Sequence, residues 1–329
     1  MQNPWVRGRP ARKFLKNVGR MPAYPVKPKV LQLPQKGKKS MVMTQDDYRS
    51  ITAYVFDICG IVLGDDKQYL VEQRLTPVLG ELGCCSFAEL GKKLSSGAAT
   101  FLTREKILNA MTTNETSFFR DEHPYVAFRD KIMSDMMERV RQRKERAWQR
   151  RGPKVSMWSA AASTGQEPYS MAMIISDVVN MKGMGLVAME DFGILGTDIS
   201  SKVLSKAMEG RYGPLEVARG LTPDMRSKHF LKDGDHFVIN DKIRKIVEFK
   251  AFNIQDPFTQ IGGFDVIFCR NILIYFTDDA KRKILAQFYQ ILAPGGYLIL
   301  GSAENMYNLN DDFIAERHGA TTVYRKPDN

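Results

Sequence analysis

Apolar residues recur at intervals of three and four between residues 44 and 111, the spacing that places them on one face of a helix. One such stripe covers residues 48–62 and a second covers residues 70–82. A shorter stripe covers residues 103–111. We therefore expect this part of the chain to form a small domain built of helices alone.

After residue 152 the pattern changes to short apolar runs that alternate with helical stripes. Residues 264–269 are nearly all apolar, as expected for a strand buried on both faces. Such alternation is typical of an α/β fold with a mostly parallel sheet covered on both sides. The predicted strands are residues 155–158, 192–199, 245–252, 264–269, 297–300 and 321–325.

Two further stretches complete the predicted organisation. Residues 121–150 have the pattern of one long helix, and its end carries seven basic residues between positions 139 and 151. Residues 211–250 are mixed, with short β-like runs at 237–239 and 243–247, and are expected to form a small inserted subdomain. The predicted parts are an arm (1–43), a helical domain (44–120), a linking helix (121–151) and an α/β domain (152–329).

The net charge of +11 belongs to the first residues of the chain. Residues 1–40 contain eleven Lys or Arg and no Asp or Glu, so the remainder carries 37 charges of each sign. Residues 1–43 also hold six prolines and few periodic apolar residues, which predicts a flexible arm. This arm is either a solvated extension or a segment that docks on an acidic protein, a nucleic acid or an anionic lipid surface.

The composition excludes several classes of protein. No run of about eighteen apolar residues exists, so no membrane span is expected, and the first residues lack the apolar core of a signal peptide. The four cysteines form no CxxC pair and only four histidines are present, which argues against a structural metal site and a disulfide framework. Reduced thiols and a cytoplasmic location are the simpler interpretation.

The first strand of the α/β part leads through small residues into a helix. Residues 159–163 are Ser or Ala, Gly165 permits a left-handed turn, and Pro168 is favoured in the first turn of a helix. Open α/β sheets bind ligands beyond the carboxyl ends of their strands, so we expect a site here.

Charged residues follow two other predicted strands. Asp198 ends the second strand, where it is suited either to accept hydrogen bonds from ribose hydroxyls or to cap the following helix. Arg270 follows the buried run at 264–269 and is expected at the same edge of the sheet. Residues 112–120 mix Thr, Asn, Phe and Arg without a period, which fits either a ligand-lining loop or a plain connector.

Three of these stretches form a recognisable set. Residues 114–120 are NETSFFR, residues 159–170 are SAAASTGQEPYS, and residues 264–276 are FDVIFCRNILIYF. In this order, and after a helical domain, they resemble the chemoreceptor glutamate methyltransferases of bacterial chemotaxis, the CheR type. The resemblance covers roughly residues 44–326.

The resemblance implies a fold and an activity. The fold is a Rossmann-like methyltransferase sheet whose last strand is antiparallel, preceded by an all-helical domain and carrying a small β insertion. The implied activity moves a methyl group from S-adenosylmethionine to glutamate carboxylates in the cytoplasmic domains of chemoreceptors. The products are S-adenosylhomocysteine and a glutamate methyl ester, and the process is adaptation in chemotaxis.

Roles for individual residues follow from the resemblance by position. Arg120, Arg270 and Tyr275 are the implied catalytic groups. Arg270 and Tyr275 would face the methyl group and the incoming substrate, and Arg120, with Asn114 and Thr116, would hold the methionine and sulfonium end. Asp198 is implied to bind the ribose, and Asn253 with its neighbour to flank the adenine. The full implied cofactor-binding set is Asn114, Thr116, Arg120, Ala161, Glu167, Asp198, Asn253, Ile254, Arg270 and Asn271.

Contacts with the receptor are a separate expectation. Lys67 and Arg74, on the polar face of the second helical stripe, are candidates for meeting an acidic receptor surface. Family members that dock on a receptor's C-terminal pentapeptide usually have a longer, glycine-rich loop where this chain has the short stretch 230–239. We therefore expect methylation without such a tether.

The implied chemistry is simple, and two alternatives stay open. A glutamate carboxylate with a pKa of about 4.3 is already ionised at neutral pH, so the reaction needs positioning rather than a general base. One alternative is a relative that binds the cofactor without transferring methyl; the other is a nucleic-acid methyltransferase, suggested by the basic arm.

Ala161 and Ala162 replace a common Gly and Cys of the family, and Gln166 replaces a common Glu, which bears on cofactor affinity.

Overall fold

The computed structural model describes residues 42–146 and 154–328. The predicted arm at 1–43 lies almost entirely outside these residues, as does the end of the predicted linking helix. Within the described ranges, no helix combines the length and the apolar character needed to cross a membrane.

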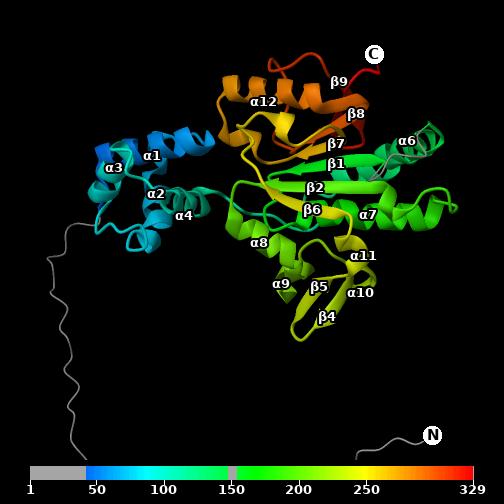
Figure 1. The fold of residues 1–329 in the computed structure, drawn as a ribbon, viewed down its shortest axis with the longest axis horizontal. Helices are drawn as coiled ribbons and strands as arrows, with labels where there is room; N and C mark the ends of the chain where they lie inside the picture. The colour runs from blue at the N-terminus through cyan, green and yellow to red at the C-terminus, as the bar shows by residue number, and fades with distance from the viewer. Residues whose placement is uncertain (1–41, 147–153, 329) are drawn as a thin grey trace, which may run out of the picture. The chain divides into compact units, whose positions relative to one another are not determined.

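The helical pattern between residues 44 and 111 forms four α-helices around a core of their own (Figure 1). Polar residues start three of these helices: the side chains of Thr44, Ser86 and Thr100 accept hydrogen bonds from backbone N–H groups of the first turn. The second stripe was predicted to continue to residue 82, but the helix ends at Leu75 and a 3-10 turn containing Pro77 follows. The helices are α1 (Gln45–Cys59), α2 (Gln68–Leu75), α3 (Phe87–Ser95) and α4 (Phe101–Met111).

The predicted linking helix begins at His123 rather than at residue 121. It runs through α5 (His123–Ala127), a π-helical turn (Phe128–Ile132) and α6 (Met133–Arg146). Asp265, buried in the sheet, accepts hydrogen bonds from Arg139 and Arg143 of α6. Part of the basic run in this helix therefore holds the helix against the sheet.

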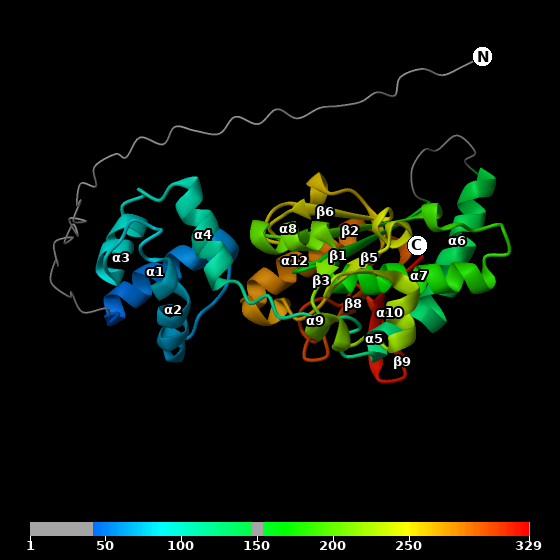
Figure 2. The same cartoon turned by 90° about the horizontal axis from the view of Figure 1, so that it is seen from below.

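The α/β part is built on a seven-stranded sheet with the order β6-β2-β1-β7-β8-β10-β9 (Figures 1 and 2). The pairs β1·β2, β1·β7, β2·β6 and β7·β8 are parallel, whereas β10 is antiparallel to both of its neighbours. This confirms the expected mostly parallel sheet with an antiparallel last strand. The strands are β1 (Val155–Ala160), β2 (Phe192–Asp198), β6 (Val247–Ala251), β7 (Phe264–Cys269), β8 (Leu292–Leu300), β9 (Ile314–His318) and β10 (Thr321–Arg325).

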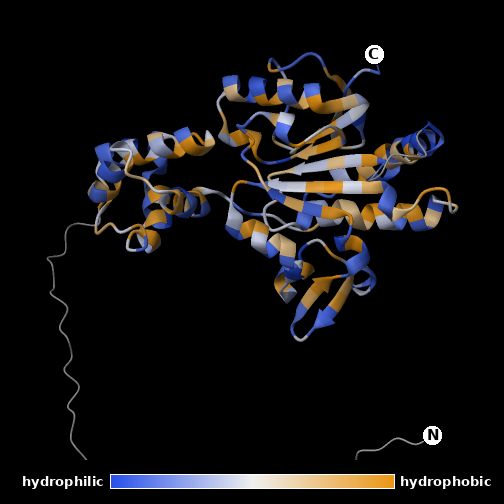
Figure 3. Ribbon diagram, in the orientation of Figure 1, coloured by the Kyte–Doolittle hydropathy of each residue, from blue (hydrophilic) through white to orange (hydrophobic). Residues whose placement is uncertain are grey.

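The central strands of the sheet are buried on both faces, as the apolar run at 264–269 predicted. Alternate residues of β1 enter different cores: Val155 and Met157 pack with α7, whereas Trp158 and Ala160 pack with α12. Figure 3 shows apolar residues along the central strands and along α7. The helices beside the sheet are α7 (Gln166–Lys182), α8 (Ser201–Glu209) and α12 (Asp278–Ile291).

The predicted insertion contains a second sheet of three short strands in the order β3-β5-β4. Most of the run at 243–247 was wrongly predicted as β-structure: residues 241–244 form helix α11, which Asn240 caps through its side chain, and only Val247 belongs to a strand, β6. The insertion comprises β3 (Arg211–Tyr212), α9 (Pro214–Ala218), α10 (Pro223–His229), β4 (Phe230–Asp233), β5 (His236–Ile239) and α11 (Asp241–Arg244).

Candidate functional site

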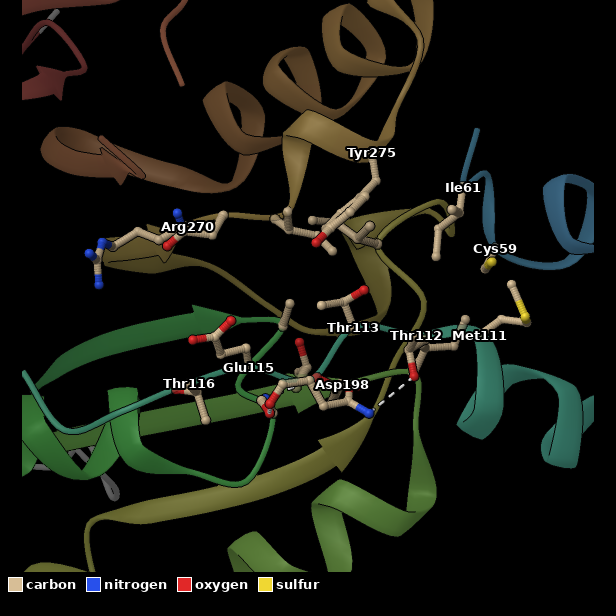
Figure 4. A pocket seen from close by; sticks show the side chains of 18 of the residues that line it. Cys59, Ile61, Met111, Thr112, Thr113, Glu115, Thr116, Asp198, Arg270 and Tyr275 are labelled. Carbon is tan, nitrogen blue, oxygen red and sulfur yellow. Dashed lines mark hydrogen bonds between the residues drawn. The ribbon is translucent and has the colours of Figure 1, made fainter. Parts of the chain in front are cut away.

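A pocket lies beyond the carboxyl ends of β1, β2 and β7, where the sheet order places the first crossover (Figure 4). Its empty volume is about 1150 Å³, counting the solvent at its mouth. Residues 111–117 cross it, and residues of α2 and of the segment after α1 also line it. All residues predicted for catalytic or cofactor-binding roles line this one pocket: Asn114, Thr116, Arg120, Ala161, Glu167, Asp198, Asn253, Ile254, Arg270, Asn271 and Tyr275.

The turn after β1 adopts an unusual backbone. Ala161, Ser163 and Gly165 have φ angles of 62°, 50° and 94°, and the first two are values that residues other than glycine rarely adopt. Hydrogen bonds hold the turn: Ala162 N–H donates to the carbonyl of Thr197, and the Ser163 hydroxyl donates to the carbonyl of Asn114. Left-handed backbone maintained in this way is common at ligand-binding sites.

Asp198 stands at the end of β2 with 7% of its surface exposed. Its Oδ2 accepts the N–H of Ser163 and its Oδ1 accepts the N–H of Ser200, each at 2.9 Å. Burial raises the pKa of this carboxyl, and the backbone donors oppose the shift. The cap of α8 is Ser200, not Asp198, so the helix-cap alternative is wrong. Each carboxylate oxygen has a further lone pair for a ligand hydroxyl.

The guanidinium of Arg270 is turned into the protein. It donates to Oδ2 of Asp121 at 2.8 Å, to the carbonyl of Arg120 at 2.8 Å and to Oε2 of Glu167 at 3.2 Å. Only 1% of the side chain is exposed, and in Figure 4 it points away from Tyr275. This geometry indicates that Arg270 holds the pocket wall in place. It does not favour the predicted contact with an incoming substrate.

Glu167, in the first turn of α7, forms an ion pair with Arg270, and its side chain is 12% exposed. Its Oε1 accepts the hydroxyl hydrogen of Ser159 at 2.9 Å and its Oε2 accepts from Arg270. Burial raises the pKa of Glu167, although Arg270 and the Ser159 hydroxyl favour its charged form. A buried charge needs such partners, and Glu167 depends on Arg270 for its charge partner.

The remaining catalytic candidates lie on two segments. Arg120 donates to the carbonyl of Glu115 at 2.7 Å, a bond that leaves other N–H groups of its guanidinium for a ligand. Tyr275 ends a 3-10 turn (Leu273–Tyr275), and its ring lines the pocket. Its backbone carbonyl accepts the N–H of Val62, which ties this turn to the segment after α1.

The two residues predicted for receptor docking are placed differently. Arg74 lines the pocket, where its guanidinium donates to the carbonyl of Met111 at 2.5 Å and to the hydroxyl of Thr113 at 2.9 Å. Lys67 lies outside the pocket and pairs with Asp66 at the surface. Arg74 is thus engaged in holding the connector that enters the site, which does not support its docking role.

The part of the pocket wall that comes from the helical domain was not predicted from the sequence. Cys59, Ile61 and Leu63 line the pocket, and Asn253 donates to the carbonyl of Ile58 at 3.1 Å. The left-handed cap at Gly60 turns the chain sharply at this point. Gly60 was the signal in the sequence for this part of the wall. When a helix ends at a sharp turn beside a site, the residues after the turn face that site.

The donors in the pocket fit S-adenosylmethionine. A buried carboxylate at the end of β2 suits ribose hydroxyls, and Asn253 offers an amide beside it. Arg120 and Glu167 suit the carboxylate and ammonium groups of an amino acid. The Nε atom of Arg270 is buried without a hydrogen-bond partner, which leaves one donor for a ligand. Among the described residues, no cluster of three or more His, Cys, Asp or Glu has the arrangement of a metal site.

Comparison with protein families decides the assignment. The CheR methyltransferase SAM-binding domain matches residues 114–321, and the CheR methyltransferase all-alpha domain matches residues 46–112. The chain belongs to the CheR methyltransferase family. It is an S-adenosylmethionine-dependent methyltransferase, and the two matched domains correspond to the α/β part and the helical part.

Named CheR relatives cover most of the chain. A chemotaxis protein methyltransferase 1 of Vibrio cholerae is 38% identical over 287 residues, which is 87% of this chain and 98% of the relative. A protein of the same name from Pseudomonas aeruginosa is 35% identical over 85% of this chain and 97% of its own length. The chemotaxis protein methyltransferase of Escherichia coli is 31% identical over 86% of this chain and 92% of its own length.

Proposed function

We propose that the protein is a protein-glutamate O-methyltransferase that acts in the cytoplasm on glutamates of chemoreceptor cytoplasmic domains. The supporting observation is that the predicted catalytic and cofactor-binding residues all line one pocket at the carboxyl edge of the sheet. The names of the relatives, chemotaxis protein methyltransferases, support the choice of receptor as substrate. The formal charge of residues 41–329 nets zero, which gives no support to a nucleic-acid substrate.

In this proposal the cofactor is held along its length. Asp198 binds the ribose, and Asn253 and Ile254 flank the adenine. Ala161 forms the turn that lets the backbone approach the ligand, and Asn271 closes the site after β7. The amino-acid end is bound by Asn114, Thr116, Arg120 and Glu167.

The protein's part in the reaction is positioning. S-adenosylmethionine supplies an electrophilic methyl group on a sulfonium, and the glutamate carboxylate is ionised at neutral pH without a base. Arg120 attracts this carboxylate into the pocket, and the Tyr275 hydroxyl orients it. Alignment of this kind contributes roughly 7–11 kcal/mol to lowering a barrier. Arg270 acts indirectly, by fixing Glu167 and the turn at Asp121.

The test combines a product assay with one substitution. Receptor cytoplasmic fragments incubated with the protein and labelled S-adenosylmethionine should acquire label that mild alkali releases, as an ester would. Tyr275→Phe should lower kcat, while the dissociation constant for S-adenosylhomocysteine, measured by calorimetry, stays within about twofold of the wild type. Equal losses in both quantities would contradict the role given to Tyr275, and alkali-stable label would contradict the ester.

Recognition of the receptor is proposed to be independent of a C-terminal pentapeptide. The β4–β5 hairpin is short: Asp233 pairs with His236, and only Gly234 and Asp235 lie between them. Receptor fragments with and without the pentapeptide should therefore give the same KM. A KM that rises several-fold on removal of the pentapeptide would show that the tether is used.

The basic arm is proposed to dock on an acidic partner. Its eleven positive charges and lack of acidic residues support this interpretation. Deleting residues 1–40 should leave kcat on a receptor fragment unchanged and should remove any binding to acidic partners that weakens as salt rises. A loss of kcat after the deletion would place the arm in the catalytic function instead.

A further inference from the structure

Glu304 lies in the loop after β8 and does not line the pocket, yet its carboxylate contacts the loop that does. Its Oε2 accepts the backbone N–H of Asn271 at 2.8 Å and that of Gly301 at 2.7 Å. Its Oε1 accepts the backbone N–H of Leu273 at 2.7 Å and that of Ile274 at 3.4 Å. One carboxylate therefore gathers four backbone donors from two loops.

This arrangement fixes an otherwise unfavourable backbone. Asn271 has a φ angle of 59°, and neighbouring N–H groups at 271, 273 and 274 point to one side of the loop. Successive backbone N–H groups of this kind form a concavity that binds an anion, and hydrogen bonds to a charged acceptor are about twice as strong as neutral ones. The side chain of Glu304 occupies that concavity.

The loop that Glu304 holds carries Tyr275. The N–H of Tyr275 donates to the carbonyl of Ile272 at 3.2 Å, inside the segment fixed by Glu304, and its own carbonyl accepts from Val62 at 2.9 Å. The backbone on both sides of the Tyr275 ring is therefore anchored. On the side that follows β7, the backbone is anchored by the hydrogen bonds that Glu304 accepts.

We propose that Glu304 is a positioning residue for methyl transfer, whose carboxylate fixes residues 271–274 from behind the pocket and thereby aims the ring of Tyr275 at the reacting carboxylate. This inference rests on the role proposed above for Tyr275. It assigns a function to the sequence Gly301-Ser302-Ala303-Glu304, none of whose residues lines the pocket.

Gly301 offers a second way to disturb the same contact. A Cβ atom at Gly301 would lie 2.6 Å from Oε2 of Glu304 and 2.8 Å from the backbone nitrogen of Asn271. Because the φ of Gly301 is not in the left-handed region, alanine there strains the contact and not its own backbone. Gly301→Ala thus displaces the loop while keeping the carboxylate.

The decisive experiment is a double-mutant cycle on kcat, using the full chain with saturating S-adenosylmethionine and a receptor fragment. Glu304→Gln, which keeps one acceptor oxygen, should lower kcat roughly 10- to 100-fold, the effect of a displacement of about 1 Å. In the Tyr275→Phe background, Glu304→Gln should lower kcat less than about threefold, because the Tyr275 hydroxyl that Glu304 positions is already absent. Gly301→Ala should show the same dependence on Tyr275.

The outcomes separate this proposal from the one on which it rests. If Glu304→Gln lowers kcat by the same factor with and without the Tyr275 hydroxyl, Glu304 does not act through Tyr275 and the proposal is wrong. If Tyr275→Phe alone leaves kcat unchanged, the role proposed above for Tyr275 is wrong, and the role of Glu304 that rests on it is wrong as well. Glu316→Gln is the matched control, since Glu316 lies in β9, does not line the pocket and has His318 as an ion-pair partner, and it should leave kcat unchanged. Should Glu304→Gln not fold, the cycle with Gly301→Ala decides the question alone.

Discussion

The Nη2 atom of Arg270 lies 2.8 Å from Oδ2 of Asp121, and this ion pair joins the end of β7 to the turn after residues 114–120. The turn is strained: Phe119, Asp121 and Glu122 have φ angles of 49°, 65° and 40°. Arg270 also donates to a carbonyl inside the turn and to Glu167. One buried guanidinium therefore connects a strained turn, a strand end and the start of α7.

The first prediction follows from this burial. Arg270→Ala should lower the free energy of unfolding by about 3–5 kcal/mol, because it leaves Glu167, whose side chain is only 12% exposed, without its charge partner. The control is Arg282→Ala, which removes an exposed ion pair with Asp279 and should change stability by less than about 1 kcal/mol. Urea unfolding measures both. A loss below 1 kcal/mol for Arg270→Ala would mean that Glu167 is accommodated without it.

The second prediction concerns the ribose contact proposed for Asp198. Asp198→Ala should weaken binding of S-adenosylhomocysteine by about 1.5–3 kcal/mol, the usual contribution of a hydrogen bond to a charged acceptor. The turn holding Ser163 would also lose a bond, which adds to the effect. Asp224→Ala, at an exposed carboxylate in α10, is the control and should leave affinity unchanged. An unchanged dissociation constant for Asp198→Ala, measured by calorimetry, would exclude the ribose role.

The third prediction is a pH dependence of stability. Burial raises the pKa of Glu167 in the folded protein above its unfolded value of about 4.3, so the folded state binds the proton more tightly. The contribution of Glu167 to stability is therefore fully present below the unfolded pKa and is lost as pH rises through the folded pKa. The stability of the wild type relative to Glu167→Gln should fall as pH rises from about 4.3 and then level off. Urea unfolding of both proteins across this range measures it, and a difference that grows with pH would contradict the sign.

The general fold and the positions of Asp198 and Arg270 were predictable because their signals are local. The apolar run at 264–269 is the signal of a buried parallel strand. Asp198 stands at the end of β2, the position at which open α/β sheets place a ribose-binding carboxylate. Strand ends alone place Asp198 and Arg270 at this edge of the sheet, whereas the other site residues were placed by the resemblance to the CheR family. All of the predicted catalytic and cofactor-binding residues line the pocket in the structure.

Other features depended on tertiary contacts that no local pattern carries. β9 was missed because its residues are mostly exposed and polar, and only its pairing with β10 makes it a strand. The inward direction of Arg270 depends on Asp121, a residue 149 positions away. Likewise, the sequence pattern predicted a surface role for Arg74, whereas its side chain donates hydrogen bonds to residues 111 and 113.

The last prediction concerns how the insertion meets the segment at 114–120. Gly220 has a φ of 97°, and a Cβ atom there would overlap the backbone carbonyl of Phe118, which cannot move as a side chain would. Phe118 is fully buried and packs edge-on against Tyr212 and Phe230 of the insertion. Gly220→Ala should therefore destabilise the protein by clearly more than the roughly 1 kcal/mol that a left-handed backbone alone costs.

Gly234 supplies the matched comparison for this prediction. Its φ is 58°, but a Cβ atom there would have no neighbour within 4 Å, so Gly234→Ala should show only the backbone cost of roughly 1 kcal/mol. Because both glycines are left-handed, the difference between the two losses in urea unfolding isolates the contact with Phe118. The same Gly220→Ala protein should bind S-adenosylhomocysteine more weakly, since Phe118 directly follows residues 111–117, which cross the pocket. Equal stability losses for the two glycines would show that the insertion can separate from this segment at no cost.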